Sequence, residues 1–422
     1  MDRRLRILCY MDSPTCATGF ATVSRNVLEA LYKTGKYDID VLGINYWGDP
    51  HNFPYRIWPV GNNPERDPYG RKKICNMIQK MDFDILFFMQ DSFILDFLPE
   101  LIPHLKQHIN RPFKSVVYFP IDGFPKESWV RNVSFCDEVI TYANFGKVLC
   151  ENTGPFAAGM KVIPHGVNMD EFKPLPAEDV AEFRKRYFGR HHDKFIFMNL
   201  NRNQQRKDIP RTIQAFYEVR KQNPDTLLYL HMAKQDQGWN LPEVCSAYGF
   251  SINNDIIFPE NFGPNQGYPR EIVNMLYNCT DCVVSTCLGE GWGLSWIEAM
   301  AAKRPVIMPR NTAMEEMITP DKGYLVDSGT NPSLWTILPY DNEVRRPLVD
   351  VNHLTKTMLH VINNYEEATR KAETAYEWVK SDLQWQGKVG EQWVNLFDSV
   401  AASLNSEQEE ESADNTLNSE TF

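Results

Sequence analysis

Two glutamates and three glycines lie close together in the segment GEGWGLSWIE, which runs from Gly289 to Glu298. A strand-like run, DCVVST, ends just before it, and apolar residues at helical spacing begin at Leu294. The glycines therefore occupy a predicted strand-to-helix turn, where the chain can adopt positive φ and approach a ligand closely. The backbone amides that begin such a helix attract an anion, for example a phosphate or a diphosphate.

The two carboxylates suit a different part of the same ligand. Glu290 and Glu298 would repel a phosphate, but a carboxylate accepts hydrogen bonds from hydroxyl groups, which sugars present. Amides for a diphosphate and carboxylates for a polyol together predict a nucleotide-sugar site. A structural alternative exists for Glu298 alone, because Ser295-x-x-Glu298 is also a helix capping box.

The wider segment GEGWGLSWIEAMAAKRPVI resembles the signature of retaining glycosyltransferases of the GT-B fold, the group called family 4 or glycosyl transferases group 1. KVIPHGVN at 161–168 resembles the end of the family's N-terminal domain, and FIFMNLNRNQQRKDIPRTIQAF at 195–216 resembles the first strand and helix of its nucleotide domain. The resemblance covers residues from about 5 to 330. It implies two doubly wound α/β domains of the Rossmann type that face each other across a cleft.

The resemblance also implies roles for individual residues. Arg202 and Lys207 would bind the donor diphosphate and stabilise the leaving nucleotide, because fixed cations stabilise developing negative charge. Their neighbours Arg206 and Arg211 could replace either one. Glu290 would contact the transferred sugar and Glu298 the donor ribose.

Three further parts of the chain would complete the site. The residues expected to bind the donor through the turn and the start of the helix are Gly291, Trp292, Gly293, Leu294 and Ser295. The loop at 12–20 resembles the family's glycine-containing first loop and contributes Gly19, although it has one glycine where many members have two. Asp122 follows the predicted strand SVVYFP and would face the reacting sugar. In this family the leaving phosphate is thought to accept the acceptor's proton, so no second catalytic acid is expected.

The alternation of apolar strands and helices independently predicts two α/β domains. Strand-like runs occur at 5–11, 39–44, 84–89, 115–120 and 138–143, and again at 195–200, 226–232, 255–259, 281–286 and 304–309. Such near-continuous apolar strands belong in parallel sheets that helices cover on both faces. The proline-rich segment FKPLPA at 172–177 separates the two groups.

We therefore expect four regions along the chain. They are an N-terminal Rossmann-like acceptor domain at 1–176, a donor domain at 177–378, a C-terminal helix at 379–403 that packs back towards the N-terminal domain, and a disordered acidic tail at 404–422.

Composition narrows the class of protein. The formal net charge of −11 argues against nucleic-acid and anionic-membrane partners, although the basic run Arg71-Lys72-Lys73 leaves a small opening. Nine scattered cysteines and no membrane-length apolar run predict a soluble cytoplasmic protein that is at most peripheral to a membrane. Cys279 and Cys282 have zinc-like spacing, but only Cys287 lies near them and a fourth ligand is lacking. We expect no metal and no cofactor.

The sequence thus predicts retaining transfer of a sugar from a nucleoside-diphosphate sugar to an acceptor that it does not identify: a glycan, a lipid or a small molecule. Two alternatives remain. One is a catalytically silent protein that binds nucleotide sugars, since Lys303 stands where the family usually has glycine. The other is transfer onto a modified nucleic-acid base.

Overall fold

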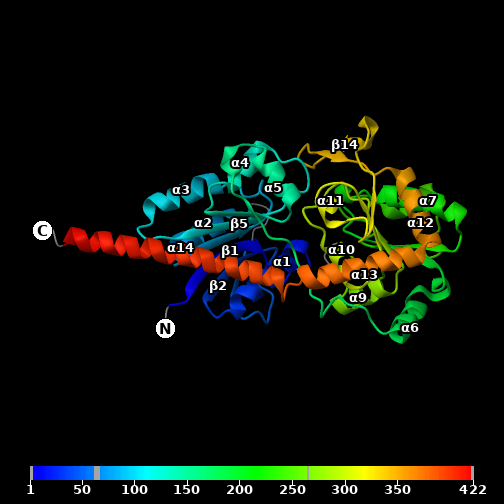
Figure 1. Ribbon diagram of the computed structural model, residues 1–422, viewed down its shortest axis with the longest axis horizontal. Coiled ribbons are helices and arrows are strands. Elements are labelled where there is room, and N and C mark those ends of the chain that lie inside the picture. Colours follow the sequence, from blue (N-terminus) through cyan, green and yellow to red (C-terminus); the bar gives the residue numbers. More distant parts are fainter. Residues whose placement is uncertain (1–2, 61–66, 264–265, 420–422) are drawn as a thin grey trace. The chain divides into compact units, whose positions relative to one another are not determined.

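The computed structural model describes residues 3–60, 67–263 and 266–419. The chain divides into two compact units. The first comprises Met1–Ile121, Pro125–His165 and Trp385–Phe422, and the second comprises Asp122–Phe124 and Gly166–Gln384. Each unit contains its own parallel sheet with helices around it (Figure 1).

The first unit is built on a seven-stranded sheet in the order β3-β2-β1-β4-β5-β6-β7, in which every pairing is parallel. The strands are β1 (Leu5–Asp12), β2 (Tyr37–Ile44), β3 (Arg56–Pro59), β4 (Ile85–Met89), β5 (Lys114–Phe119), β6 (Glu138–Thr141) and β7 (Lys161–Val162). The helices between them are α1 (Gly19–Lys33), α2 (Arg71–Lys80), α3 (Leu98–His108), α4 (Glu127–Val133) and α5 (Asn144–Glu151). All five residues of β4 are buried, as expected for a strand covered on both faces.

The glycine-containing loop after β1 is a capped entry to a helix. Thr18 is the N-cap of α1: its hydroxyl accepts from the amide of Ala21 at 3.0 Å and donates to Asp12 Oδ2 at 2.7 Å. Gly19 is the first helical residue. The loop is therefore fixed at the carboxyl end of β1, the edge at which doubly wound sheets bind ligands.

The second unit is built on a six-stranded parallel sheet in the order β10-β9-β8-β11-β12-β13. Its strands are β8 (Phe195–Leu200), β9 (Thr226–His231), β10 (Ile256–Ile257), β11 (Cys282–Val284), β12 (Val306–Pro309) and β13 (Tyr324–Val326). Its helices are α6 (Ala177–Phe188), α7 (Ile209–Gln222), α8 (Leu241–Ala247), α9 (Arg270–Asn278), α10 (Leu294–Ala301), α11 (Met314–Met317), α12 (Val351–Asn363) and α13 (Tyr365–Asp382). The strand order reverses between β8 and β11, so the loops after these two strands flank a topological switch point. A separate antiparallel hairpin joins β14 (Trp335–Ile337) to β15 (Arg345–Pro347).

The boundary between the units differs from the predicted one. The second unit begins at Gly166, whereas the sequence placed the change at 176/177. The proline-rich segment is tied to α9: the amides of Lys173 and Leu175 donate to the side chains of Asn274 and Asn278 at 3.1 and 3.0 Å. These bonds make the segment part of the second unit. At the other end the chain returns to the first unit at Trp385, later than the predicted residue 379.

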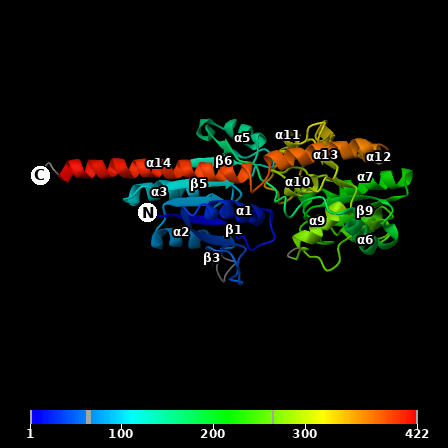
Figure 2. The same ribbon diagram turned by 60° about the horizontal axis from the view of Figure 1, so that its bottom comes forward.

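The last helix, α14 (Lys388–Ser419), belongs to the first unit (Figure 2). Its Trp393 packs against the rings of Phe87 and Tyr118, with centroids 5.6 and 4.7 Å away. The helix continues to Ser419, where the sequence predicted a disordered tail from residue 404. Leu404 is buried and Glu407 pairs with Lys114, so packing extends beyond the predicted start of the tail. The following Glu and Ala residues favour a helix, and residues 420–422 lie outside the described residues.

Candidate active site

The turn between β11 and α10 is shaped by glycine at the helix entry. Gly293 is the N-cap of α10 and has φ 104°, a left-handed conformation, and a Cβ there would overlap the ring of Trp296. Among the described residues no side chain caps this helix, and Ser295 lies inside it. The capping-box alternative for Ser295 and Glu298 is therefore wrong. Gly291 and Trp292 are buried in the turn, while Leu294 and Ser295 are half-buried at the helix start.

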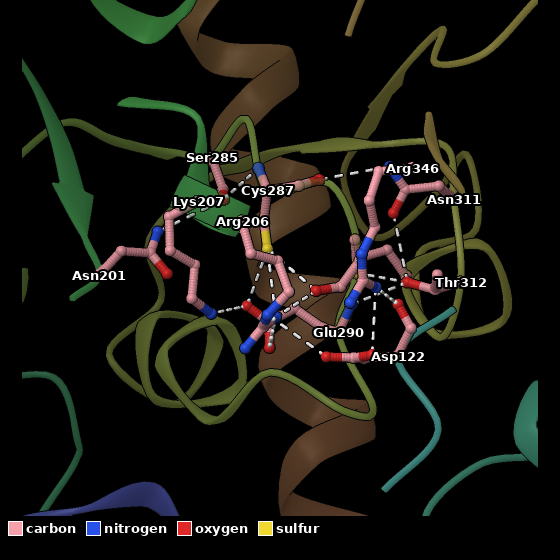
Figure 3. Close-up of polar contacts among 12 residues, drawn as sticks. Asp122, Asn201, Arg206, Lys207, Ser285, Cys287, Glu290, Asn311, Thr312 and Arg346 are labelled. Carbon is pink, nitrogen blue, oxygen red and sulfur yellow. Dashed lines mark hydrogen bonds and ion pairs between the residues drawn. The ribbon is translucent and has the colours of Figure 1, made fainter. Parts of the chain in front are cut away.

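A charged cluster surrounds Glu290, directly before this turn (Figure 3). Lys207, from the short 3-10 helix η3 (Gln205–Lys207), forms an ion pair with Oε1, and Nη1 of Arg206 lies 3.2 Å from Oε2. The Glu290 side chain is 13% exposed, and such burial would by itself raise its pKa. The two cations outweigh burial and lower the pKa to about 2. Glu290 is therefore a carboxylate at every physiological pH.

Two uncharged groups also fix Glu290. The Cys287 thiol donates to Oε1 at 3.0 Å, and burial followed by the nearby Glu290 raises the pKa of this thiol to about 12, so it keeps its proton. The backbone amide of Glu290 donates to Thr312 Oγ1 at 3.0 Å. Hydrogen bonds to its side chain and to its backbone amide thus both fix the position of Glu290.

Asp122 joins the same cluster in the second unit. Its Oδ2 lies 3.3 Å from Nε of Arg206, and its Oδ1 lies 3.1 Å from Nη1 of Arg346. Burial would raise the pKa of Asp122, but Arg346 and then Arg206 lower it below its usual value. Asp122 therefore accepts hydrogen bonds and does not donate them at neutral pH.

The structure brings together three of the residues predicted to be catalytic: Glu290, Lys207 and Asp122. Arg202 is not in the cluster: its side chain is 43% exposed and pairs with Asp236 at 2.6 Å. Arg206, considered in the sequence only as a substitute, instead bridges Glu290 and Asp122. Gly19 lies in the first unit, at the start of α1.

Sequence reasoning missed Arg346, Cys287 and Thr312. Arg346 stands 224 residues from Asp122 and Thr312 stands 22 from Glu290, so no local motif links the partners. The only available signal was the position of Cys287 between the strand-like run and the glycine turn.

Glu298 lies on α10 and has different contacts. Its Oε2 accepts from the hydroxyl of Tyr277 at 3.1 Å, and the same hydroxyl lies 2.9 Å from the carbonyl oxygen of Ser295. Burial raises the pKa of Glu298 from 4.5 to about 7, against the opposing effects of Arg270 and Tyr277. The two glutamates of the motif therefore differ in charge state near neutral pH.

This difference predicts a pH-dependent stability. A pKa raised in the folded state stabilises the protein fully below the unfolded value, and that contribution is lost as the pH rises through about 7. Glu298→Gln resembles the protonated acid, so we expect it to exceed the wild type in unfolding free energy by up to about 3 kcal/mol at about pH 8 and to match it at about pH 4. Urea unfolding at both pH values measures this. A difference that does not depend on pH would contradict it.

A comparison of the sequence with known protein families finds a match that includes part of the charged cluster. Residues 181–335 match the sequence model of the family described as Glycosyl transferases group 1, and the charged residues Arg206, Lys207 and Glu290 lie within the match. This stretch of the chain is similar to the group 1 glycosyltransferases. The matched residues fall in the second unit.

One curated relative and several solved structures are similar. The chain is 24% identical over 241 residues to a GDP-mannose-dependent alpha-(1-6)-phosphatidylinositol monomannoside mannosyltransferase of Mycolicibacterium smegmatis, covering 55% of this chain and 54% of the relative. The chain thus spans about half the length of that relative. Sucrose-phosphate synthase from Thermosynechococcus elongatus has a TM-score of 0.72 at 17% identity, covering 95% of this chain and 100% of the other. Anabaena HepE in complex with UDP and glucose has a TM-score of 0.69 at 15% identity, covering 94% and 100%.

These likenesses confirm the predicted fold, a GT-B protein with two Rossmann-like domains. In the described residues, no helix is long and apolar enough to cross a membrane. The same residues contain no group of three His, Cys, Asp or Glu side chains placed to hold a metal ion. Cys279, Cys282 and Cys287 are all buried free thiols.

Proposed function

We propose that the protein is a retaining glycosyltransferase of the family 4 type that transfers a sugar from a nucleoside-diphosphate sugar. The observation that carries this proposal is the ionised Glu290, held by Lys207 and Arg206 at the entry to α10 inside the matched domain. A carboxylate beside fixed cations suits a donor whose sugar becomes positive as its diphosphate leaves.

In the proposed reaction the bond between the anomeric carbon and the diphosphate oxygen breaks. The acceptor oxygen bonds to the same face of that carbon, and its proton passes to the leaving phosphate. Lys207, Arg206 and the first amides of α10 stabilise the charge of the diphosphate, and Arg202 assists if it leaves Asp236 for the donor. Glu290 and Asp122, both ionised, accept hydrogen bonds from sugar hydroxyls. No metal takes part.

Glu298 has a separate proposed role at the donor ribose. Removal of its carboxylate hydrogen bond should weaken donor binding by about 1–2 kcal/mol. The donors to examine first are UDP and GDP sugars, because the Anabaena structure holds UDP and glucose and the mycobacterial relative is GDP-mannose-dependent.

Thermal unfolding with UDP, GDP and ADP tests the proposed donor site. A diphosphate at 100 times its Kd should stabilise the protein by about 2.7 kcal/mol, a shift of several degrees in Tm. At least one diphosphate should give this shift, and the matching nucleotide sugar should be hydrolysed slowly. If none of the three diphosphates shifts the Tm, the proposal is wrong.

Lys303, which motivated the silent alternative, has a structural explanation. It follows the end of α10 with φ 55°, a position where glycine is the usual helix stop. Its ammonium pairs with Glu373 at 2.6 Å. The departure from glycine thus concerns the end of a helix and a contact with α13, and it gives no reason to doubt turnover.

The basic run Arg71-Lys72-Lys73, considered for nucleic-acid binding, makes contacts within the first unit. Arg71 pairs with Asp96 at 2.8 Å, and Lys73 donates to the carbonyl oxygen of Pro59. Asp67 accepts from the amides at the start of α2. No observation therefore favours a nucleic-acid acceptor over a glycan, a lipid or a small molecule.

A further inference from the structure

The hairpin β14–β15 carries an arginine into the charged cluster. The match to the family ends at residue 335, where β14 begins, so the hairpin lies almost wholly beyond it. The tip of the hairpin is open to solvent, with Ile337 and Tyr340 exposed. The side chain of Arg346 is nevertheless only 3% exposed. A charge this deeply buried needs partners to offset its lost hydration.

Two carboxylates supply those partners from different directions. Asp341, in the hairpin loop, accepts from Nε at 2.7 Å and from Nη2 at 3.1 Å, a two-bond pairing that fixes the guanidinium plane. The remaining Nη1 reaches Asp122, where it donates to Oδ1 at 3.1 Å and also to the carbonyl oxygen. Arg346 therefore restrains both the side chain and the main chain of Asp122 (Figure 3).

Two glycines leave room for this guanidinium. A Cβ on Gly123 would lie 2.8 Å from Nη1 of Arg346, and a Cβ on Gly289 would lie 2.9 Å from the same atom. Both distances are too short for real side chains. The path of Arg346 to Asp122 thus depends on glycine in the segment after Asp122 and in the turn before Glu290.

Charge sharing in the cluster shows what Arg346 contributes. Arg206 contacts Asp122 through Nε and Glu290 through Nη1. Without Arg346, Asp122 would depend on Arg206 for its charged partner and would compete for it with Glu290. With Arg346 present, Asp122 has its own cation and Arg206 can serve both carboxylates.

We propose that Arg346 is a positioning residue for glycosyl transfer, which holds the Asp122 carboxylate beside Glu290 and Arg206. This inference rests on the proposed function, in which Asp122 faces the transferred sugar. Arg346 acts through Asp122 and does not itself touch the substrate. The hairpin is then part of the active-site scaffold.

A double-mutant cycle tests the contact without reference to activity. Unfolding of the wild type, Arg346→Ala, Asp122→Asn and the double variant should show that the two single losses do not add, because either change breaks the same pair. Arg345→Ala is the matched control, since Arg345 lies on the same hairpin but is exposed and stacks over Trp335 at 4.1 Å. Additive losses would overturn the inference. If Arg346→Ala does not fold, Arg346→Lys replaces it in the cycle, because it keeps the charge and loses the paired geometry.

Kinetics then test positioning, with the best donor found. Arg346→Ala should lower kcat at least about 10-fold with little change in donor KM, and the acid limb of its pH profile should move to higher pH because Asp122 loses a cation. Guanidinium at low millimolar concentration should restore part of kcat, and Arg345→Ala should keep wild-type kcat.

The inference would be overturned if folded Arg346→Ala kept the wild-type kcat and pH profile. It would also be overturned if kcat fell without a shift of the pH profile and without rescue by guanidinium. Absence of transfer by the wild type would instead count against the proposed function, while the cycle would still decide the contact.

Discussion

Glu290→Gln is expected to lower kcat by at least about 100-fold while donor KM changes only a few-fold. Gln keeps the shape of the side chain but removes the negative charge that Lys207 and Arg206 face. In the proposed reaction that charge matters most when the anomeric carbon becomes positive, so the loss falls on the chemical step. Steady-state kinetics with the identified donor measure it, and Glu315→Gln on the exposed surface of α11 is the matched control.

The same variant should lose stability, because it leaves two cations without their shared carboxylate. A pKa lowered from 4.5 to about 2 means that ionised Glu290 stabilises the fold above about pH 4.5 and that this contribution fades as the pH falls towards 2. It corresponds to about 3 kcal/mol. We therefore expect Glu290→Gln to unfold earlier in urea at neutral pH and to approach the wild type near pH 3. Full turnover by Glu290→Gln would show that the cluster is only a binding turn.

Gly289→Ala is expected to have the second large effect, on stability and activity together. An added Cβ would overlap the carbonyl oxygen of Asp122 and would lie 2.9 Å from Nη1 of Arg346. Neither the main chain of Asp122 nor the doubly paired guanidinium can yield easily, so the cluster must open. We expect a loss of about 1–3 kcal/mol in unfolding free energy and a loss of most of the turnover.

Gly267→Ala provides the control, because a Cβ at Gly267 would meet no atom of the described residues within 4 Å. Thermal unfolding and initial rates of both variants are the measurements. A wild-type Tm and rate for Gly289→Ala would contradict the packing of Asp122 and Arg346 against the turn.

Both sheets could be predicted because their strands are buried on both faces and therefore read as unbroken apolar runs. Each of the ten predicted runs overlaps an observed strand, from β1 to β12. Strands that sequence reasoning missed are short or polar, such as β7 with two residues and β15 with the sequence RRP. These strands form through pairing with neighbours that a local pattern does not reveal.

Residues of the candidate site could be named from the sequence where they lie close together in it. Glycines at a predicted strand-to-helix turn indicate an anion site, and this prediction directed attention to Glu290, which the structure places in the charged cluster. The choice between Arg202 and Arg206 could not be made from sequence, since both are cations near the same strand end and the turn of η3 decides which one points to Glu290. Arg346 could not be predicted from the sequence, because its contact with Asp122 forms only when the fold brings the hairpin to that residue.

The capping-box interpretation of Ser295 and Glu298 was a local pattern that the structure does not bear out. Ser295 and Glu298 have the correct spacing, but the helix begins at Leu294, two residues too early for Ser295 to cap it. A shift of this size decides whether Glu298 binds the backbone or Tyr277. Sequence periodicity does not locate helix ends so closely.

Mass spectrometry of transfer products tests the central claim most directly. Wild-type protein and Glu290→Gln would each be incubated with a mixture of UDP and GDP sugars and a cell extract of the source organism as the acceptor pool. We predict that the wild type adds the mass of one sugar residue to an acceptor and releases one nucleoside diphosphate per transfer, and that Glu290→Gln forms this product at about one hundredth of the rate or less. Donor binding without any product from the wild type, or equal product from both proteins, would contradict the account.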